Sequence, residues 1–374
     1  MTTSLFENFG LKKIINASGK MTALGASAVT DEIGNALKAA AQDYVDIDEL
    51  IQYAGTVIAH HTGAEDGCPT VGAAAGIAIS IASVIAGKNL SLIERMPNSE
   101  GLKNEIIIQK GQNVHFGGSI DQMIRLGGGH VVEVGSANKV ECDHIEEAIT
   151  EKTAALLYIK SHHAVQKGMQ SIEAMMSIAK KHSIPFIIDA AAENDFKKYY
   201  AMGADIIIYS GGKALEGPTS GFICGKGHFM EAARKQYKGI GRAMKVGKEA
   251  IAGLITALNQ YPDKDDRVDE QISRMTNLCD RLNKVEGLSC SIKQDEAGRP
   301  IYRAQIEVKK EAGMTAERIL HQLESGNPAI YLRHHYVNVG ILSVDPRPLL
   351  LGQEDIIADQ IMSIIKEAKE NNVR

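Results

Sequence analysis

The stretch DIIIYSGGK, residues 205–213, places one lysine at the end of an apolar run. Three isoleucines and a tyrosine predict a buried strand, and the glycines after Ser210 predict a turn. Strand ends carry the functional sites of α/β proteins. Partial desolvation there would lower the pKa of the Lys213 amine and let it form a Schiff base with an aldehyde. A solvated loop lysine explains this segment equally well.

Short β-branched runs recur on both sides of this stretch, each followed by a helical or glycine-rich segment. The alternation predicts an α/β lobe with a mostly parallel sheet covered by helices. One such helix is expected over Ser171–His182, because its apolar side chains share a face. The expected strands are Glu105–Gln109, His130–Val134, Ala155–Ile159, Pro185–Asp189, Asp205–Tyr209 and Gly221–Cys224.

The chain has 374 residues, more than one hydrophobic core usually organises, so two lobes are expected. From about Gly247 the pattern changes to long amphipathic helices and then to a mixed α+β tail. The later helices are expected at Ala250–Tyr261, Asp266–Val285 and Glu354–Lys369. The predicted division is an N-terminal arm over residues 1–55, a large domain over 56–246 and a small C-terminal domain over 247–374.

Charge and composition exclude several classes of protein. The net charge of −5 provides no basic field for a phosphate backbone, which disfavours nucleic acid as a partner. The five cysteines are odd in number and scattered without a Cys-x-x-Cys pair, which favours a reducing cytoplasm. The N-terminus lacks a signal-like apolar run, and the apolar stretch Ile77–Ala86 is too short to span a bilayer, so neither secretion nor membrane insertion is predicted.

An anion site is predicted before the helical run Ile77–Ile85. The segment Pro69–Gly76 supplies small residues, including Ala74 and Ala75, that would leave backbone N–H groups accessible at a helix N-terminus. Two hydroxyls near the lysine could add to it, Ser210 and, as a weaker donor, Thr219. Close helix packing also uses small residues and is the more common explanation for such a stretch in isolation.

Two further side chains complete a candidate site. Asp189 ends a predicted strand, and His115 follows another in the segment Asn113–Gly118. Asp189 alone could cap a turn, and lone histidines are more often structural. However, the predicted anion site, the His115 ring, the Asp189 carboxylate and Lys213 follow one another along the chain. Each lies at a strand end or at a helix start. Pyridoxal 5′-phosphate (PLP) explains all four, with Asp189 holding the pyridinium nitrogen protonated and His115 stacking on the ring.

These motifs resemble those of PLP-dependent fold-type I enzymes, and more narrowly the family of L-seryl-tRNA selenium transferase. The resemblance spans nearly the whole chain. It implies the aspartate-aminotransferase fold, with a mostly parallel sheet in the large domain and a smaller α+β C-terminal domain. The segments that carry it are Ile15–Gly19, Gly72–Gly76, Ile188–Ala191, Ser210–Lys213, Gly217–Gly221 and Gly241–Lys248, with Gly326–Arg333 and Val344–Leu349 pointing to a short ammonia-lyase branch.

By position, the resemblance implies that Lys213 is the Schiff-base lysine. It gives Asp189 and His115 the roles described above and makes phosphate contacts of Ala74, Ala75 and Ser210. Arg242 and Lys245 would lie near a phosphate, within the subunit or across a subunit boundary, and Arg333 would face the substrate carboxylate.

The basic residues have simpler explanations. Arg242, Lys245 and Lys248 could form a solvated basic patch before a helix. Arg333 could make only a surface ion pair, which stabilises little, and Arg347 is expected to do just that.

The resemblance to the short branch implies elimination on D-glucosaminate 6-phosphate, giving 2-keto-3-deoxygluconate 6-phosphate and ammonia, in a cytoplasmic homodimer or larger assembly. No metal site is predicted. A selenium transferase acting on seryl-tRNA is the first alternative, but the chain begins almost at the shared core, without a tRNA-binding domain, and is acidic. A PLP lyase acting on another amino acid and a non-catalytic binding protein are the others.

Overall fold

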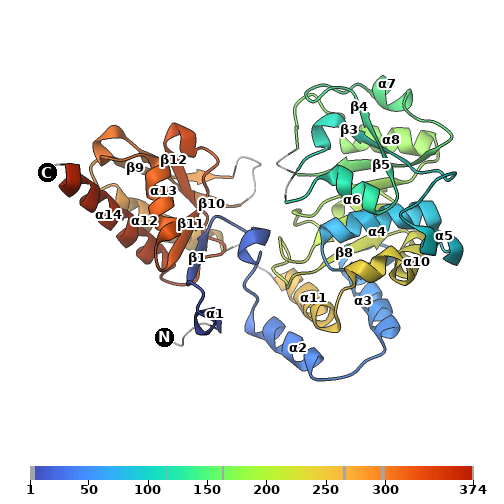
Figure 1. The fold of residues 1–374 in the computed structure, drawn as a ribbon, viewed down its shortest axis with the longest axis horizontal. Coiled ribbons are helices and arrows are strands. Elements are labelled where there is room, and N and C mark those ends of the chain that lie inside the picture. Colours follow the sequence, from blue (N-terminus) through green and yellow to red (C-terminus); the bar gives the residue numbers. More distant parts are fainter. Residues whose placement is uncertain (1–4, 116, 162–163, 264–266, 296–299, 373–374) are drawn as a thin grey trace. The chain divides into compact units, whose positions relative to one another are not determined.

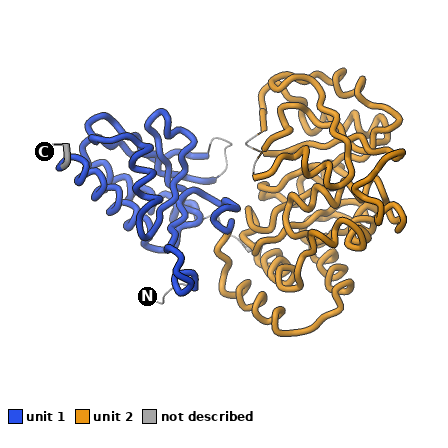
Figure 2. Tube along the Cα trace, viewed as in Figure 1, with its two compact units in different colours: residues 1–26, 264–374 blue, residues 27–263 orange. Residues whose placement is uncertain are grey.

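The computed structural model describes residues 5–115, 117–161, 164–263, 267–295 and 300–372 (Figure 1). The chain divides into two compact units (Figure 2). Unit 1 contains residues 1–26 and 264–374, and unit 2 contains residues 27–263.

Unit 2 is built on one seven-stranded sheet, ordered β2-β8-β7-β6-β5-β3-β4. The strands are β2 Asp66–Thr70, β3 Glu105–Gln109, β4 His130–Val134, β5 Thr153–Ile159, β6 Phe186–Asp189, β7 Ile206–Ser210 and β8 Gly221–Gly225. β8 runs antiparallel to both of its neighbours, β2 and β7, and the other pairs are parallel. The mostly parallel sheet is therefore confirmed, and β2 is an additional edge strand.

Alternating side chains of the sheet enter two separate cores. Ile207 and Tyr209 belong to one core, whereas Ile206 and Ile208 belong to the other. Successive side chains of a strand point to opposite faces, so a strand covered by helices on both sides is apolar at every position. This requirement explains the continuous apolar run that precedes Ser210.

Helices accompany the sheet of unit 2. They are α2 Asp31–Ala41, α3 Ile47–Thr62, α4 Ala73–Ala86, α5 Leu90–Arg95, α6 Ile120–Leu126, α7 Cys142–Glu146, α8 Ile172–Lys181, α9 Lys198–Met202, α10 Gly227–Lys235 and α11 Lys248–Gln260. Helix α8 begins after Ser171, whose hydroxyl accepts a hydrogen bond of 3.2 Å from the Ala174 N–H, and this cap explains the predicted start. Within the described ranges, no helix has both the length and the apolar character needed to cross a bilayer.

Unit 1 is a smaller α+β unit. Its strands are β1 Ile14–Ala17, β9 Leu288–Gln294, β10 Tyr302–Val308, β11 Ala329–Leu332 and β12 Ile341–Val344, and its helices are α1 Leu5–Asn8, α12 Val268–Leu282, α13 Ala316–Ser325 and α14 Gln353–Asn372. β12, β10 and β9 form an antiparallel sheet, whereas β1 pairs in parallel with β11. The N-terminal strand therefore belongs with the C-terminal part of the chain.

The two units divide the chain at different points from those expected from the sequence. The expected boundaries follow residues 55 and 246, whereas the chain passes from one unit to the other after residues 26 and 263. The physical reason is packing, because α11 contacts both α2 and α3. Helical periodicity located α11 correctly but did not indicate which unit its apolar face would join.

Candidate active site

Asp189, Ser210 and Lys213 lie at one edge of the sheet of unit 2. β6 and β7 are parallel neighbours, so their carboxyl ends meet there. The Ala190 N–H donates to the Ile208 carbonyl at 2.9 Å, and the Ser210 N–H donates to the Ala191 carbonyl at 3.3 Å. These bonds hold the chain after Asp189 beside the chain that leads to Lys213.

The loop that carries Lys213 is closed by its own backbone. The Gly211 N–H donates to the Ser220 carbonyl at 2.8 Å, and the Gly217 N–H donates to the Gly211 carbonyl at 2.7 Å. A Cβ atom added to Gly211 would lie 2.1 Å from the Ser220 hydroxyl oxygen, so only glycine fits here. The half-buried Lys213 therefore projects from a tightly constrained turn.

Ser27 contributes a contact that sequence reasoning missed. Its hydroxyl donates to the Gly212 carbonyl at 2.8 Å, directly before Lys213. The two residues are separated by 185 positions in the sequence, and no motif surrounds Ser27. Only the folded chain brings this serine to the lysine loop.

Asp189 is a buried carboxylate with few partners. Burial raises its pKa to about 6, against the opposing effects of the Lys213 charge and the Ala191 N–H. The Ala191 N–H donates to Oδ1 at 3.1 Å, a turn contact of the kind that the simpler interpretation predicted. No described residue donates a hydrogen bond to Oδ2. A cationic nitrogen of a ligand would fit this second oxygen.

The N-terminus of α4 reaches the same edge. Gly221 of β8 pairs with Thr70 at the end of β2 and with Ser210 at the end of β7. The Thr70 hydroxyl donates to the Gly72 carbonyl at 3.0 Å, which fixes the turn into the helix. Thr70 is a further residue that the sequence did not single out.

The first N–H groups of α4 suit an anion. The N-cap residue is Gly72, which has no side chain to bond them. Among the residues that the structure describes, none accepts a hydrogen bond from the N–H groups of Ala73, Ala74 or Ala75. Ala74 is exposed, so a phosphate can approach these donors. The anion site, the Asp189 carboxylate and the Lys213 amine together fit PLP.

Two other predicted residues lie at the surface of unit 2. His115 follows β3, is exposed and forms an isolated bridge with Ser119. Nearby, the Asn113 amide donates to Glu133 at 2.7 Å and fixes the loop. Thr219 is exposed beside the buried Ser220. Stacking by His115 and donation by Thr219 stay predictions.

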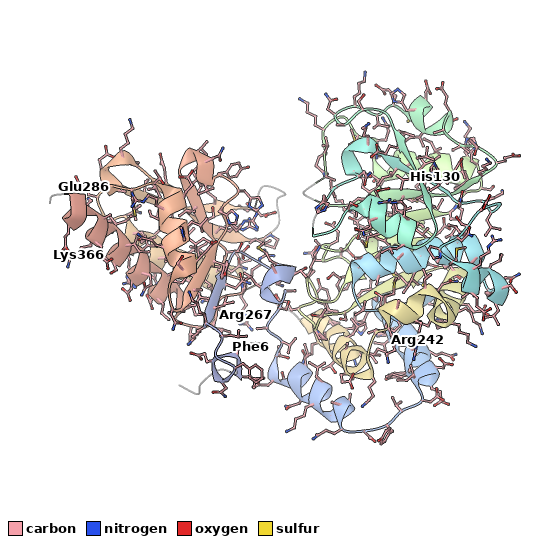
Figure 3. The ribbon with its side chains drawn as sticks, viewed as in Figure 1. Phe6, His130, Arg242, Arg267, Glu286 and Lys366 are labelled. Carbon is pink, nitrogen blue, oxygen red and sulfur yellow. The ribbon has the colours of Figure 1, made fainter. Side chains whose placement is uncertain are left out.

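The basic segment after α10 separates into two kinds of residue. Arg242, labelled on unit 2 in Figure 3, and Lys245 are both exposed, and no described acidic side chain pairs with either. Lys248 is different, because its amine donates to the carbonyls of Ala40 and, at 2.6 Å, Asp43 near the end of α2. The prediction of a solvated patch is therefore wrong for Lys248, which satisfies carbonyls that a helix end leaves without partners.

Arg347 and Arg333 lie in unit 1. Arg347 Nε and Nη2 donate to the two carboxylate oxygens of Asp345 at 2.9 and 2.7 Å. Because Asp345 is fully buried, the prediction of a surface ion pair for Arg347 is wrong. Arg333 is half-buried, and its pKa is lowered by burial and by the charge of Arg303.

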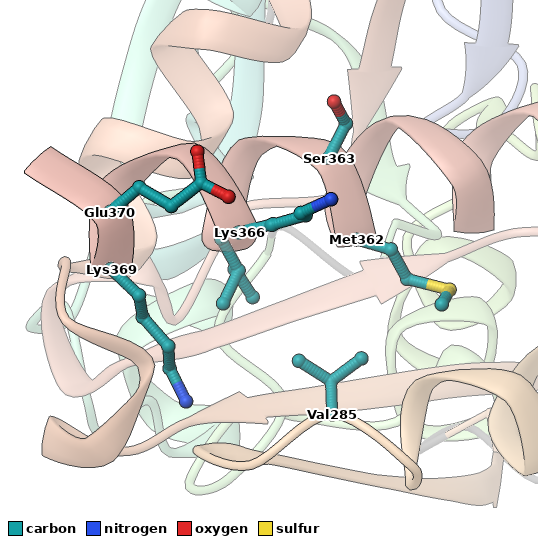
Figure 4. A pocket seen from close by; sticks show the side chains of 7 residues that line it. Val285, Met362, Ser363, Lys366, Lys369 and Glu370 are labelled. Atoms are coloured by element: carbon teal, nitrogen blue, oxygen red, sulfur yellow. The ribbon is translucent and has the colours of Figure 1, made fainter.

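An apolar groove of unit 1 runs beside α14 (Figure 4). The residues that line it are Val285, Met362, Ser363, Ile365, Lys366, Lys369 and Glu370. None of the predicted site residues lines it. The groove therefore lies outside the candidate residues of unit 2 and outside those of unit 1.

Comparisons with known proteins agree with the fold. The family model described as L-seryl-tRNA selenium transferase matches residues 14–339. The chain is 43% identical over 371 residues to D-glucosaminate-6-phosphate ammonia lyase of Salmonella typhimurium, covering 99% of this chain and 100% of that protein. It is 40% identical over 368 residues to 5′-C-glycyluridine monooxygenase-decarboxylase of a Streptomyces species, covering 97% and 92%.

Solved structures give the same result. A structure of D-glucosaminate-6-phosphate ammonia-lyase superposes with a TM-score of 0.95 at 43% identity, covering 99% of this chain and all of that one. Aspartate aminotransferase from Thermus thermophilus superposes with a TM-score of 0.54 at 14% identity, covering 96% and 88%, and shows the fold alone. The predicted α/β fold of fold-type I PLP enzymes is confirmed.

Proposed function

The chain belongs to the L-seryl-tRNA selenium transferase family, and on this premise we propose that it is a PLP-dependent ammonia-lyase converting D-glucosaminate 6-phosphate to 2-keto-3-deoxygluconate 6-phosphate and ammonia. One observation carries this proposal, the 43% identity to a lyase of that name over the whole of both chains. The Lys213 and Asp189 edge of unit 2 supports it, because an elimination beside an amine needs both a base and an electron sink.

Residues of unit 2 would hold the cofactor. The Lys213 amine would bind its aldehyde, the N–H groups at Ala74 and Ala75 and the Ser210 hydroxyl would bind its phosphate, and Asp189 would hold its ring nitrogen protonated. When bound, PLP supplies a ring that withdraws electrons from the substrate Cα. With a pKa of about 6, Asp189 is mainly ionised at neutral pH and provides the negative charge that this role requires.

Side chains of this protein would carry out the proton transfers. The Lys213 amine, when it is not bound to the cofactor, would remove the substrate Cα proton as a general base. Protonated Lys213 or His115 would donate the proton with which the 3-hydroxyl leaves as water. Hydrolysis restores one water and releases ammonia, so the overall reaction yields the keto acid and ammonia.

Cationic residues would bind the anionic groups of the substrate. We assign the substrate carboxylate to Arg333 and another anionic group of the substrate to Lys245, which is exposed on unit 2. Arg242, exposed in the same segment, is assigned to the cofactor phosphate. Arginine provides a bidentate fork and lysine a point charge. Since exposed cations of this kind suit a site completed at a subunit boundary, we also propose a homo-oligomer. We propose separately that the protein is cytoplasmic.

Absorption spectra and a coupled assay test the proposal. Wild-type protein should show a band near ~420 nm and release keto acid and ammonia from D-glucosaminate 6-phosphate, and Lys213→Ala should lose both. Lys226→Ala is the matched control, because Lys226 follows β8 and pairs with Asp205 at 2.5 Å, and it should keep both. A band without turnover would reject the substrate, and no band after reconstitution would reject the cofactor.

A second candidate comes from the relative named as a monooxygenase-decarboxylase, which is 40% identical over 97% of this chain. Related sequences with the same fold can carry different chemistry. Release of carbon dioxide rather than ammonia from an amino-acid substrate would favour this candidate. Salt-dependent binding of seryl-tRNA would instead favour the selenium transferase activity.

A further inference from the structure

Two cysteines of unit 1 lie next to each other in its core. Cys279 is in the last turn of α12 and Cys290 is in β9, two elements that pack against each other (Figure 1). The residues are 6% and 7% exposed and belong to one hydrophobic core. Both are free thiols, and their Sγ atoms are 2.6 Å apart, so either can donate its proton to the other. A disulfide bond needs only a small further approach, to about 2.05 Å.

Asn283 holds the backbones of both cysteines in place. Its N–H donates to the Cys279 carbonyl at 2.8 Å, one helical turn earlier. Its side-chain amide donates to the Cys290 carbonyl at 3.0 Å, and its Oδ1 accepts from the Cys290 N–H at 2.7 Å. In the sheet, Cys290 also pairs with Ile306 of β10. Backbone contacts, and not side-chain rotation alone, therefore keep the two thiols close together.

The two thiols differ in acidity. A hydrogen bond from the Cys290 thiol lowers the pKa of Cys279, although burial acts in the opposite direction. The pKa of Cys290 is raised, because losing its proton would break that bond and place a second charge in the core. By contrast, burial raises the pKa of Cys68 and of Cys224 in unit 2 to about 12. Among the buried cysteines, Cys279 is therefore best able to form a thiolate, the reactive form of the residue.

We propose that Cys279 and Cys290 are a peroxide-sensitive pair that closes to a disulfide and reopens on reduction. Neither residue is among those assigned to the cofactor or the substrate, so the oxidation is independent of the proposed function. The oxidant must be small, because little of either residue is exposed. Hydrogen peroxide, little larger than water, meets this condition, whereas a peptide disulfide such as oxidised glutathione does not. Disulfides of reducing compartments are usually of this transient kind.

The oxidation balances with hydrogen peroxide as the one co-reactant. The Cys279 thiolate attacks a peroxide oxygen, the O–O bond breaks, and the sulfur becomes a sulfenic acid. The hydroxide that leaves takes up the proton that Cys279 had lost and becomes water. The Cys290 sulfur then attacks the Cys279 sulfur, and its proton goes to the departing oxygen, which leaves as a second water. The two thiols thus lose two electrons to one peroxide, and a dithiol reductant returns them.

The disulfide would tie the end of α12 to β9. The two cysteines are 11 positions apart, so the cross-link closes a short loop that contains the turn between Val285 and Leu288. Closing a short loop restricts the unfolded chain less than closing a long one, so the stabilisation is moderate. We therefore expect peroxide to suppress local opening in this part of unit 1.

Peptide mapping of the full-length protein tests for the disulfide. Reduced protein is treated with hydrogen peroxide, its remaining thiols are blocked, and it is digested with trypsin, which places Cys279 in Met275–Arg281 and Cys290 in Val285–Lys293. The two peptides should be joined after peroxide and should separate again after dithiothreitol. Recovery of both peptides with blocked thiols, or of Cys279 as a sulfinic acid without the joined peptide, would overturn the inference.

Single variants test which thiol attacks the peroxide. In Cys290→Ser, the sulfenic acid of Cys279 has no thiol to react with, so dimedone should label Cys279 at least about fivefold more strongly than in wild type. In Cys279→Ser, labelling of Cys290 should not increase. Cys142→Ser is the matched control, because Cys142 is exposed on unit 2, and this variant should keep the joined peptide. Unchanged labelling of Cys279 in Cys290→Ser would overturn its assignment as the attacking thiol.

Hydrogen exchange of the wild type provides a test that needs no variant, should a serine substitution prevent folding. In oxidised protein, the N–H groups of Asn283 and Cys290 should exchange at least about tenfold more slowly than in reduced protein, because the cross-link opposes local opening. Exchange in β7 of unit 2 should stay the same and serves as the internal control. Equal exchange of Asn283 and Cys290 in the two forms would overturn the stabilising role of the disulfide.

Discussion

Asp189 in unit 2 and Asp345 in unit 1 are both buried carboxylates, with exposed fractions of 8% and 0%, yet their pKa values move in opposite directions. Burial raises the pKa of Asp189 to about 6, because only the Lys213 charge and one backbone N–H oppose it. Burial also acts to raise the pKa of Asp345, but Arg347 and Arg303 outweigh it and hold the pKa below its usual range. Partners, rather than burial, decide the direction.

The comparison separates two uses of a buried carboxylate. Asp345 is already satisfied by arginines of its own unit, so it fixes their geometry. Asp189 has one oxygen without a donor among described residues, so its charge is costly until a ligand cation arrives. A carboxylate that is incompletely satisfied by its own chain is the better candidate for binding a cofactor.

The largest expected effect on stability is that of Asp345→Asn. Removing this charge leaves buried guanidinium groups without their partner, so the free energy of unfolding at neutral pH should fall by about 3–5 kcal/mol. Urea denaturation monitored by circular dichroism measures it. A loss no greater than that of an exposed ion pair, such as Arg125–Asp121 tested with Asp121→Asn, would contradict the buried-pair interpretation.

In cofactor-free protein, Asp189→Asn should change the free energy of unfolding in the direction opposite to that of Asp345→Asn. The raised folded pKa of Asp189 means that its contribution to stability is full below its ordinary pKa of 3.8 and is lost as the pH rises to about 6. Removing the charge should therefore increase the free energy of unfolding at pH 7 by up to roughly 3 kcal/mol. Chemical denaturation between pH 4 and pH 7 measures the difference, which should vanish near pH 4. A destabilised variant at pH 7 would refute this account.

Asp345 should show the reverse dependence on pH. Its pKa is depressed in the folded protein, so its stabilisation is present above the ordinary pKa of 3.8 and is lost as the pH falls toward the folded value. In the same titration, the difference between wild type and Asp345→Asn should shrink only on acidification below that point. The two variants therefore separate the carboxylates by both sign and pH range.

The smallest expected effect is that of Ser27→Ala, which tests how firmly the lysine loop must be held beside Asp189. Losing the bond to the Gly212 carbonyl should reduce stability by about 1 kcal/mol and slow turnover about fivefold. Ser99→Ala is the matched control, because the Ser99 hydroxyl also donates to a glycine carbonyl, that of Gly128, at 2.5 Å. It should reduce stability with turnover unchanged. Equal turnover in both variants would remove the positioning role from Ser27.

Several elements were predictable because the signal is local. β3 and β4 were predicted with the bounds that the structure has, and β6, β7 and β8 to within a residue at each end. A strand buried on both faces must be apolar at every position, and α8 follows Ser171, a residue type that caps helices. The edge strand β2 was missed, because it contains Gly67 and Pro69, which are unusual inside strands.

The candidate site, too, was predictable only where the signal is local. The order of Ala74, Asp189 and Lys213 at helix starts and strand ends was apparent without coordinates, since residues at the carboxyl ends of parallel strands must share an edge. The roles of Lys248 and Arg347 were misjudged. The role of Lys248 depends on a helix end far away in the sequence, and that of Arg347 depends on the burial of Asp345. Solvent exposure of a charge is not encoded near it in the sequence.

The sequence by itself determined the fold class and the family, because these depend on periodicity and short motifs, and it led to the proposal that Lys213 forms a Schiff base and Asp189 holds a pyridinium nitrogen. Only the tertiary structure decided that α11 belongs to unit 2, that Ser27 reaches the lysine loop and that Asp345 binds two arginines. The physical reason is that burial and partner choice arise from contacts between residues far apart in the chain, and these contacts set the cost of each charge.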